Sequence, residues 1–353
     1  MTLRYSTSWD NAQDSDAAAG LFSSAVISPA TAVNIASTYS RWPTGKGLRL
    51  NVAGSFGSST AQLQLTFDAQ STWIIGAAVK PLVNSNNTVI FGLRSGGFQC
   101  ELRFNGSAYY VARNGTGIAT GGTVATTAFS HVEFKVAIHG TTGSYTVRIN
   151  GTTYLTGSGV NTAGQGGTTA DTVVFSAFGQ NASGGYGGET QYDDLYIADG
   201  NSVGASPVND FLGDCRPLHL LPNANGTFSD WAQTGGTAGQ FYTAVNDTPN
   251  NGDTSYLSSG AVNQRTTLRY PALTSGTVRA VIVAPWIRKD DANVHTVSPR
   301  TYEGGTEQTG SASIQPTTTY ASRQLIMETD PKDGAAWDLT RVNNSEIGLV
   351  LVS

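Results

Sequence analysis

The chain has 353 residues, of which 13% are charged and 39% are apolar, and its net charge is −5. This length favours two domains, each able to bury a core. The acidic balance and the lack of a basic cluster argue against nucleic-acid binding. The 42 glycines are typical of short strands joined by tight turns rather than of a disordered chain.

Short apolar runs predict strands throughout the first half. Residues 61–67 alternate apolar and polar side chains, which is the two-residue period of a sheet with one wet face. The Asn-Gly pairs at 105–106, 114–115 and 150–151 predict tight hairpins, because both residue types tolerate positive φ. The predicted strands span residues 45–53, 61–67, 71–81, 88–97, 98–115, 131–140, 145–157, 171–179 and 192–200.

Residues 201–210 are predicted to form a linker or a crossover, and strands resume beyond them. The last strand, Glu346–Val352, is almost continuously apolar, so we expect it to be central in its sheet. Asp338 or Thr340 is placed to cap one helical turn before it. The other predicted strands of this half span residues 241–245, 254–260, 265–271, 277–291 and 323–331.

The sequence gives no clear signal for targeting, for a disulfide or for a metal site. The opening MTLRYSTSWDNAQDSD lacks the apolar stretch of a secretory signal, and no apolar run predicts a membrane span. Cys100 and Cys215 lie in different predicted domains, so we expect two free thiols rather than a disulfide. The four histidines show no metal-type spacing, and we expect no cofactor.

These patterns predict an all-β protein with two β-sandwich domains in tandem, residues 1–205 and 206–353. Four segments occur in the order of a LamG-like, concanavalin A-like sandwich: TWIIGAAVKP, HVEFKVAI, SYTVRINGTTYLTG and YDDLYIADG. The first domain therefore resembles the concanavalin A-like lectin and glucanase fold over about residues 20–200. This resemblance implies a jelly-roll sandwich.

The second half carries a narrower resemblance. Its segments FLGDCRPLHLLPNANGTFSDWAQTGG and METDPKDGAAWDLTRVNNSEIGLVLVS are similar to the C-terminal, jelly-roll-like region of tailed-bacteriophage virion proteins. The resemblance implies a non-enzymatic structural protein of the tail, baseplate or fibre; the alternatives are a capsid decoration protein and a stand-alone carbohydrate-binding lectin. It also implies other virion proteins as partners, a homo-oligomer (a trimer by preference), a host-surface glycan as a further ligand, and assembly in the bacterial cytoplasm.

Acidic residues give no convincing catalytic or metal-binding pattern. Asp193 and Asp194 are the candidates for a calcium site, but calcium takes six to eight oxygens. The competing interpretation is that one of them caps a turn and the other faces solvent. Glu101 and Glu133 stand alone on strands and are expected to face solvent. Paired carboxylates with the spacing of a glycoside hydrolase are missing, so we expect no catalytic residue and no enzyme.

Aromatic side chains are the best binding candidates, since exposed rings stack on sugars and anchor interfaces. Tyr186, in a glycine-rich loop, and Trp231 are the two residues proposed for such contacts. Trp73 and Trp337 are instead expected in the cores. Cys100 alternates with polar neighbours and is expected to be an inert buried side chain.

Overall fold

The chain divides into two compact units. The first is Met1–Val203 together with Val208–Leu218, and the second consists mainly of His219–Ser353. The predicted boundary at residues 205 and 206 therefore needs a correction, because Val208–Leu218 packs with the first unit. The computed structural model describes the whole chain except residues 1, 11, 13–20, 29–31, 52–59, 83–85, 178–187, 201–207, 209 and 249.

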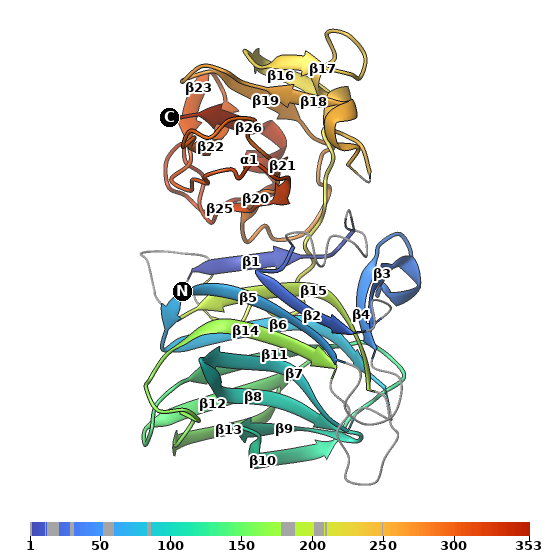
Figure 1. Ribbon diagram of the computed structural model, residues 1–353, viewed down its shortest axis with the longest axis vertical. Coiled ribbons are helices and arrows are strands. Elements are labelled where there is room, and N and C mark those ends of the chain that lie inside the picture. Colours follow the sequence, from blue (N-terminus) through green and yellow to red (C-terminus); the bar gives the residue numbers. More distant parts are fainter. Residues whose placement is uncertain are drawn as a thin grey trace. The chain divides into compact units, whose positions relative to one another are not determined.

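The first unit is a β-sandwich of two antiparallel sheets (Figure 1). Its eight-stranded sheet consists of β1 (Leu3–Thr7), β3 (Val33–Ala36), β4 (Gly47–Asn51), β6 (Thr72–Pro81), β11 (Ser130–Ala137), β12 (Gly143–Ile149), β13 (Thr152–Val160) and β15 (Glu189–Asp199). Their order is β13-β12-β11-β6-β15-β4-β3, and β1 also pairs with β15.

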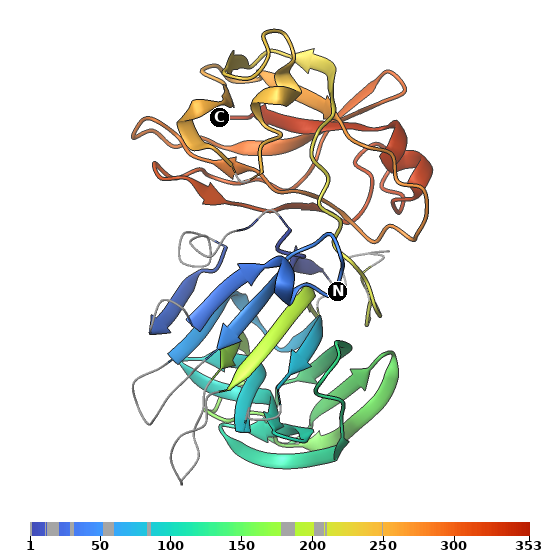
Figure 2. The same ribbon diagram turned by 90° about the vertical axis from the view of Figure 1, so that its right-hand side faces the viewer.

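The seven-stranded sheet forms the other layer, and both layers are visible from the side in Figure 2. It consists of β2 (Ser24–Ser28), β5 (Thr60–Gln70), β7 (Asn86–Ser95), β8 (Gly97–Asn105), β9 (Ala108–Arg113), β10 (Thr116–Thr123) and β14 (Ala170–Ala177). Their order is β10-β9-β8-β7-β14-β5-β2. The all-β, jelly-roll prediction is confirmed.

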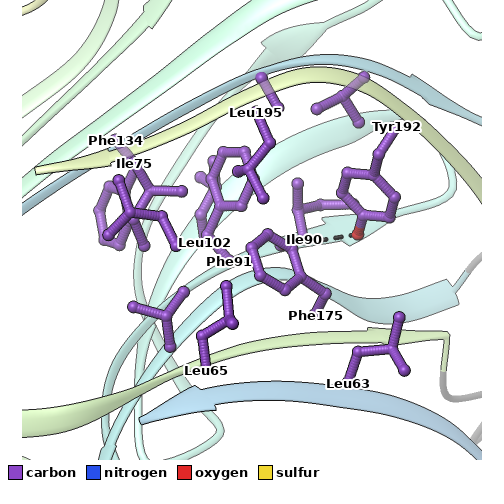
Figure 3. Packing of buried hydrophobic residues seen from close by; sticks show 14 of the residues in the cluster. Leu63, Leu65, Ile75, Ile90, Phe91, Leu102, Phe134, Phe175, Tyr192 and Leu195 are labelled. Atoms are coloured by element: carbon purple, nitrogen blue, oxygen red, sulfur yellow. Dashed lines mark hydrogen bonds between the residues drawn. The ribbon is translucent and has the colours of Figure 1, made fainter. Parts of the chain in front are cut away.

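One apolar core fills the space between the two sheets. Figure 3 shows Leu63 and Leu65 of β5 on one side of this core and Ile75 of β6, which belongs to the opposite sheet, on the other side. The buried hydroxyl of Tyr192 has a hydrogen-bond partner in this core, because it donates to the carbonyl oxygen of Ile90 at 3.2 Å. Trp73 is fully buried here, as predicted.

Two of the predicted Asn-Gly hairpins form as expected. Asn114 and Gly115 join β9 to β10 with φ values of 45° and 80°. Asn150 and Gly151 join β12 to β13 with φ values of 49° and 78°. Positive φ at both central positions is the geometry whose twist matches that of the flanking strands. These turns fix the register of two neighbouring strand pairs.

The second unit contains one five-stranded antiparallel sheet with the order β16-β19-β26-β22-β23, where β16 is Ala224–Ser229, β19 is Arg265–Arg269, β22 is Val297–Glu303, β23 is Thr306–Thr309 and β26 is Glu346–Leu351. Three two-stranded sheets accompany it. They pair β17 (Ala232–Thr234) with β18 (Tyr256–Ser258), β20 (Val281–Val283) with β25 (Leu325–Met327), and β21 (Trp286–Ile287) with β24 (Ala321–Ser322).

Several predictions for the second unit can be compared with these elements. The last strand is central in its sheet, as expected. The short helix α1 (Leu339–Asn344) is capped by Asp338, whose carboxylate accepts from the Arg341 amide at 2.8 Å. Trp337 is buried. The predicted strand at 241–245 is wrong, because that segment forms a 3₁₀ helix, η4 (Phe241–Ala244).

Both cysteines are unpaired, and Cys100 is buried in the first core. Burial raises the pKa of its thiol to about 12, so it is an inert apolar side chain as expected. Within the described ranges, no helix has the length and apolarity needed to cross a membrane.

Candidate functional site

A polar cluster lies on the outer face of the eight-stranded sheet, around two small residues of β6. Every second residue of β6 from Trp73 to Val79 points into the core, which leaves Ile74, Gly76 and Ala78 on the outer face. Gly76 of β6 pairs with Glu133 of β11 on one side and with Tyr196 of β15 on the other. These three residues therefore lie in one row across three strands. A Cβ atom at Gly76 would lie 2.1 Å from Cε1 of Tyr196. Glycine at this position therefore lets the tyrosine ring cross β6 and reach β11.

Tyr196 and Glu133 form the centre of this cluster. The Tyr196 hydroxyl donates to Oε1 of Glu133 at 2.5 Å, and both residues are buried. The Gly213 amide donates to the same carboxylate oxygen at 2.8 Å, and the Leu212 amide donates to the Tyr196 hydroxyl at 3.2 Å. Burial, followed by the charge of Glu133, raises the pKa of Tyr196 well above its usual value. The phenol therefore stays protonated and acts as a donor.

His131 lies two residues before Glu133 on the same face of β11. Its ring stacks against the Tyr196 ring, with centroids 6.3 Å apart and an interplanar angle of 18°. The imidazole is buried, and neither ring nitrogen hydrogen-bonds to any other described group. Burial lowers the pKa of His131, although nearby Glu133 opposes this. The ring is therefore neutral at pH 7 and carries an unprotonated nitrogen.

A bulge in β15 at Asp193 and Asp194 lies at the edge of the same face. It falls where β15 changes its neighbour from β4 to β1, and Asp194 has a φ of 53°. Asp193 Oδ2 accepts from the Ser40 hydroxyl at 3.1 Å and from the Arg41 amide at 2.8 Å. Asp194 Oδ2 accepts from the Trp42 indole at 2.8 Å. These contacts hold both carboxyl groups inside the protein.

The buried positions of Asp193 and Asp194 correct the expectation that one of them faces solvent. Their relative exposures are both 0%. The calcium prediction gains no support, because the neighbouring groups are N–H and O–H donors rather than further oxygen ligands. Across the part of the chain that the structure describes, no three histidine, cysteine or acidic side chains gather in a way that holds a metal.

The buried aspartates make stability depend on pH. Burial raises the pKa of Asp193 to about 6, and burial together with the charge of Asp193 raises the pKa of Asp194 to about 7, from an ordinary 3.8. The folded state then keeps protons that the unfolded chain has lost. Their contribution to the free energy of unfolding falls as the pH rises from about 4 to about 7. The lowered pKa of His131 has the opposite effect: its contribution to the free energy of unfolding falls as the pH drops below about 6.5.

Replacing Asp194 by asparagine isolates the aspartate contribution. The amide keeps an acceptor for Trp42 but carries no charge. We expect the variant to gain more in Tm over the parent at about pH 8 than at about pH 5, because the parent must ionise a buried group at the higher pH. Thermal melts at both pH values measure this, with the exposed Asp290→Asn as control. An equal gain at both pH values would mean that Asp194 titrates normally.

Residues 210–218, here called the covering segment, cross this face of the sheet. The segment belongs to the first unit although it follows β15 in the chain. Asp210 accepts from Lys135 Nζ of β11 at 3.0 Å. Asp214 accepts from both terminal nitrogens of Arg41, each at 2.5 Å. Together with the amides of Leu212 and Gly213 described above, these contacts tie the segment to the polar cluster.

A pocket of about 260 Å³ opens beside the covering segment. Two cations from neighbouring strands, Lys135 and Arg148, face the Phe211 ring, at 5.8 and 4.1 Å from its centroid. Hydroxyl groups of β6 and β12 complete the wall. The lining residues are Thr72, Lys135, Ala137, Ser144, Tyr145, Thr146, Arg148, Asp210 and Phe211. Charged groups, hydroxyls and aromatic side chains suit a polar, sugar-sized ligand.

Of the two residues proposed for aromatic contacts, Trp231 alone lies among the described residues. Tyr186 lies outside the described residues. Trp231 belongs to the second unit, is only 8% exposed, and donates its indole N–H to the carbonyl oxygen of Gln264 at 3.1 Å. Its ring is therefore occupied in packing rather than presented to a ligand.

The expectation that Glu101 and Glu133 face solvent is wrong, since both are fully buried. Glu101 accepts from the Gly115 amide at 2.9 Å and pairs with Arg103, so it supports the hairpin after β9. Glu133 instead belongs to the polar cluster. A signal for it was present, because His131, Glu133 and Lys135 are three titratable residues at every second position of one strand. The partner Tyr196 gave no comparable signal.

Comparison with solved structures finds carbohydrate-active enzymes, each at a TM-score below 0.5. An alginate lyase, Aly36B, is 16% identical with a TM-score of 0.42, over 54% of this chain and 95% of that one. An endo-β-1,4-glucuronan lyase from Trichoderma reesei is 11% identical with a TM-score of 0.36, over 47% and 86% of the two chains. A Trypanosoma rangeli sialidase is 13% identical with a TM-score of 0.31, over 43% and 25%. No protein-family model and no curated protein matches the sequence.

These comparisons contradict the prediction of a non-enzymatic virion structural protein, and with it the alternatives of a capsid decoration protein and a stand-alone lectin. The named structures with this fold are polysaccharide lyases and sialidases, which are enzymes. At such low identities the likeness concerns the fold alone. The chemistry of this chain therefore has to be argued from its own residues.

Proposed function

We propose that this chain is an enzyme that cleaves a polysaccharide on the outer face of the eight-stranded sheet, with Tyr196, Glu133 and His131 as its proton-transfer group. The observation that carries the proposal is the buried Tyr196–Glu133 hydrogen bond beside a neutral imidazole. Buried polar atoms are normally satisfied, yet Glu133 Oε2 and both His131 nitrogens have no hydrogen-bond partner in the described protein. Perturbed titratable groups of this kind cluster at functional sites.

The surroundings of this group support a sugar as the substrate. The adjoining pocket combines hydroxyl groups of β6 and β12 with two cations of β11 and β12. Saccharides are bound by such hydrogen-bonding and charged groups. The cations Lys135 and Arg148 favour sugars that carry a carboxylate over neutral ones.

The residues favour elimination over hydrolysis. Glycoside hydrolysis uses two carboxyl groups that flank the bond to be broken. Of the carboxyl groups near Glu133, Asp193 and Asp194 are held by donors of residues 40–42. The other two, Asp210 and Asp214, are paired with Lys135 and Arg41. Elimination from a uronic acid residue needs instead a base for the proton beside the carboxylate and an acid for the departing oxygen. Neutral His131 suits the base, and protonated Tyr196 suits the acid.

In the proposed step, His131 takes the proton from the sugar carbon next to the carboxylate. The electron pair left behind forms a carbon–carbon double bond, and the bond to the glycosidic oxygen breaks. That oxygen takes the proton of the Tyr196 hydroxyl, while Glu133 keeps the hydroxyl oriented. The proton on His131 then returns to Tyr196 through solvent, which restores both residues. The reaction is an elimination, so no water is added across the broken bond.

A polysaccharide panel tests the proposal. The full chain is incubated with alginate and glucuronan, and with a neutral glucan as the control polymer. We expect ultraviolet absorbance from the new double bond with the acidic polymers alone, and we expect it to be lost in His131→Gln. New reducing ends without that absorbance would mean hydrolysis. No product from any polymer, including with the Asp210→Asn/Asp214→Asn variant described below, would remove the proposed function.

The trimer, the glycan of a host surface and the virion location stay predictions from the sequence alone. The proposed chemistry does not depend on any of them.

A further inference from the structure

We infer that the covering segment occupies the place of an acidic glycan on the first unit, with Asp210 and Asp214 standing where two carboxylates of the ligand bind. This inference rests on the proposed function and adds to it the charge pattern of the ligand. It also implies that the chain, as folded here, holds its own site closed.

The first argument is the pairing of both aspartates with cations of the sheet face. Asp210 accepts from Lys135 at 3.0 Å, and Asp214 receives a two-pronged contact from Arg41 at 2.5 Å per oxygen. Proteins commonly bind acidic ligands through an arginine whose planar guanidinium donates two hydrogen bonds to one carboxylate. A glycan carboxylate would find the same two cations.

The second argument concerns the main chain between the aspartates. The amides of Leu212 and Gly213 donate to the Tyr196 hydroxyl at 3.2 Å and to the Glu133 carboxylate at 2.8 Å. Sugar hydroxyls are donors of the same kind. The segment therefore gives Tyr196 and Glu133 the hydrogen bonds that a substrate would otherwise supply. It also covers the group with an ordered backbone, so a polysaccharide cannot reach Tyr196 while the segment stays in place.

The third argument is the position of Phe211. Its six-membered ring lies 4.1 Å from the guanidinium carbon of Arg148 and lines the same pocket as Asp210. A pyranose ring with a carboxylate has this combination of a flat apolar face and a neighbouring charge. Each unit of an acidic glycan carries one carboxylate, whereas the segment places two, from Asp210 and Asp214, on two separate cations. The matching ligand therefore has at least two sugar units.

The contacts of the segment are suited to displacement. The side chains of Asp210 and Asp214 are 55% and 47% exposed. Ion pairs at such exposed sites contribute little to stability, because solvent screens them. A polymer that offers many carboxylates in one chain competes well against two aspartates at these cations. Removal of the two negative charges should therefore open the site to an acidic glycan.

The test uses the full chain and the variant Asp210→Asn/Asp214→Asn, which keeps the shape of the segment. Calorimetry measures binding of an alginate tetrasaccharide and of cellotetraose, a neutral sugar of the same length. We expect the variant to bind the alginate tetrasaccharide at least tenfold more tightly than the parent, with no gain for cellotetraose. The charge-matched control Asp253→Asn/Asp290→Asn, at exposed sites of the second unit, should show no gain.

A second measurement follows the parent chain itself. Hydrogen exchange at the amides of Leu212 and Gly213 should speed up when the alginate tetrasaccharide is added, because the ligand takes over their acceptors. Cellotetraose should leave this exchange unchanged. Slower exchange at these amides would overturn the inference, since it would mean that ligand binds on top of the segment.

The two proposals fail in different ways. Equal binding by parent and variant, together with cleavage that depends on His131, would remove the inference and leave the reaction. A tenfold gain in binding with no cleavage of any polymer would remove the reaction and leave an acidic-glycan site. A gain shared by the control variant would mean a general charge effect and would also overturn the inference.

Discussion

Cleavage of an acidic polysaccharide is expected to fall by about 10²- to 10⁴-fold when Tyr196 is replaced by phenylalanine, which is the usual contribution of a positioned general acid. The substitution removes one oxygen and leaves the ring over Gly76, so the row across β6 keeps its packing. Glu133 loses its hydroxyl donor but keeps the Gly213 amide. Initial rates on alginate and glucuronan measure the effect, in the parent background and in Asp210→Asn/Asp214→Asn.

Tyr192→Phe provides the matched control for this variant. Tyr192 belongs to the same strand but points into the core, where its hydroxyl donates to the carbonyl of Ile90. Its loss costs about 1 kcal/mol of stability and leaves the outer face unchanged. We expect a lower Tm with full activity. If Tyr192→Phe and Tyr196→Phe slow cleavage equally, the hydroxyl of Tyr196 has no direct role in the reaction.

Val136→Asp is expected to abolish soluble folding of the first unit. Val136 is fully buried on β11, on the face opposite to Glu133 and Lys135. An unpaired carboxylate in this apolar core costs several kcal/mol, which is comparable to the whole stability of an ordinary domain. Far-ultraviolet circular dichroism and the soluble fraction after expression measure the loss.

The control for this prediction is Thr153→Asp on β13, the edge strand of the same sheet. Thr153 is exposed, so its charge stays in water. Substitutions at such surface positions change stability by about 0.5 kcal/mol or less. A Val136→Asp variant that melts like the parent would mean that β11 does not bury this face.

Strand positions in the first unit followed from the sequence wherever the pattern was local. The alternation in residues 61–67 lies within β5, and the Asn-Gly turns at 114–115 and 150–151 carry the expected positive φ. Short edge strands without a clear pattern, such as β1 and β10, were missed. The aromatic run at residues 241–245 predicts a strand but forms the 3₁₀ helix Phe241–Ala244, because so short a run does not distinguish the two.

The site was missed for a different reason. The alternation of His131, Glu133 and Lys135 was visible, and a polar strand face ordinarily means solvent. Burial of that face depends on residues 210–218, which lie far along the chain and were assigned to the second domain. No local pattern predicts that a later segment returns to cover an earlier strand.

The local pattern of residues in the sequence is enough to specify an all-β sandwich, because strand periodicity and turn residues involve only near neighbours in the chain. The meeting of Tyr196 with Glu133 is of another kind. It requires three strands in one register, a glycine between two large side chains, and a covering segment that excludes water. These are contacts between residues remote in sequence, and their energies depend on burial, which exists only once the sheets have packed.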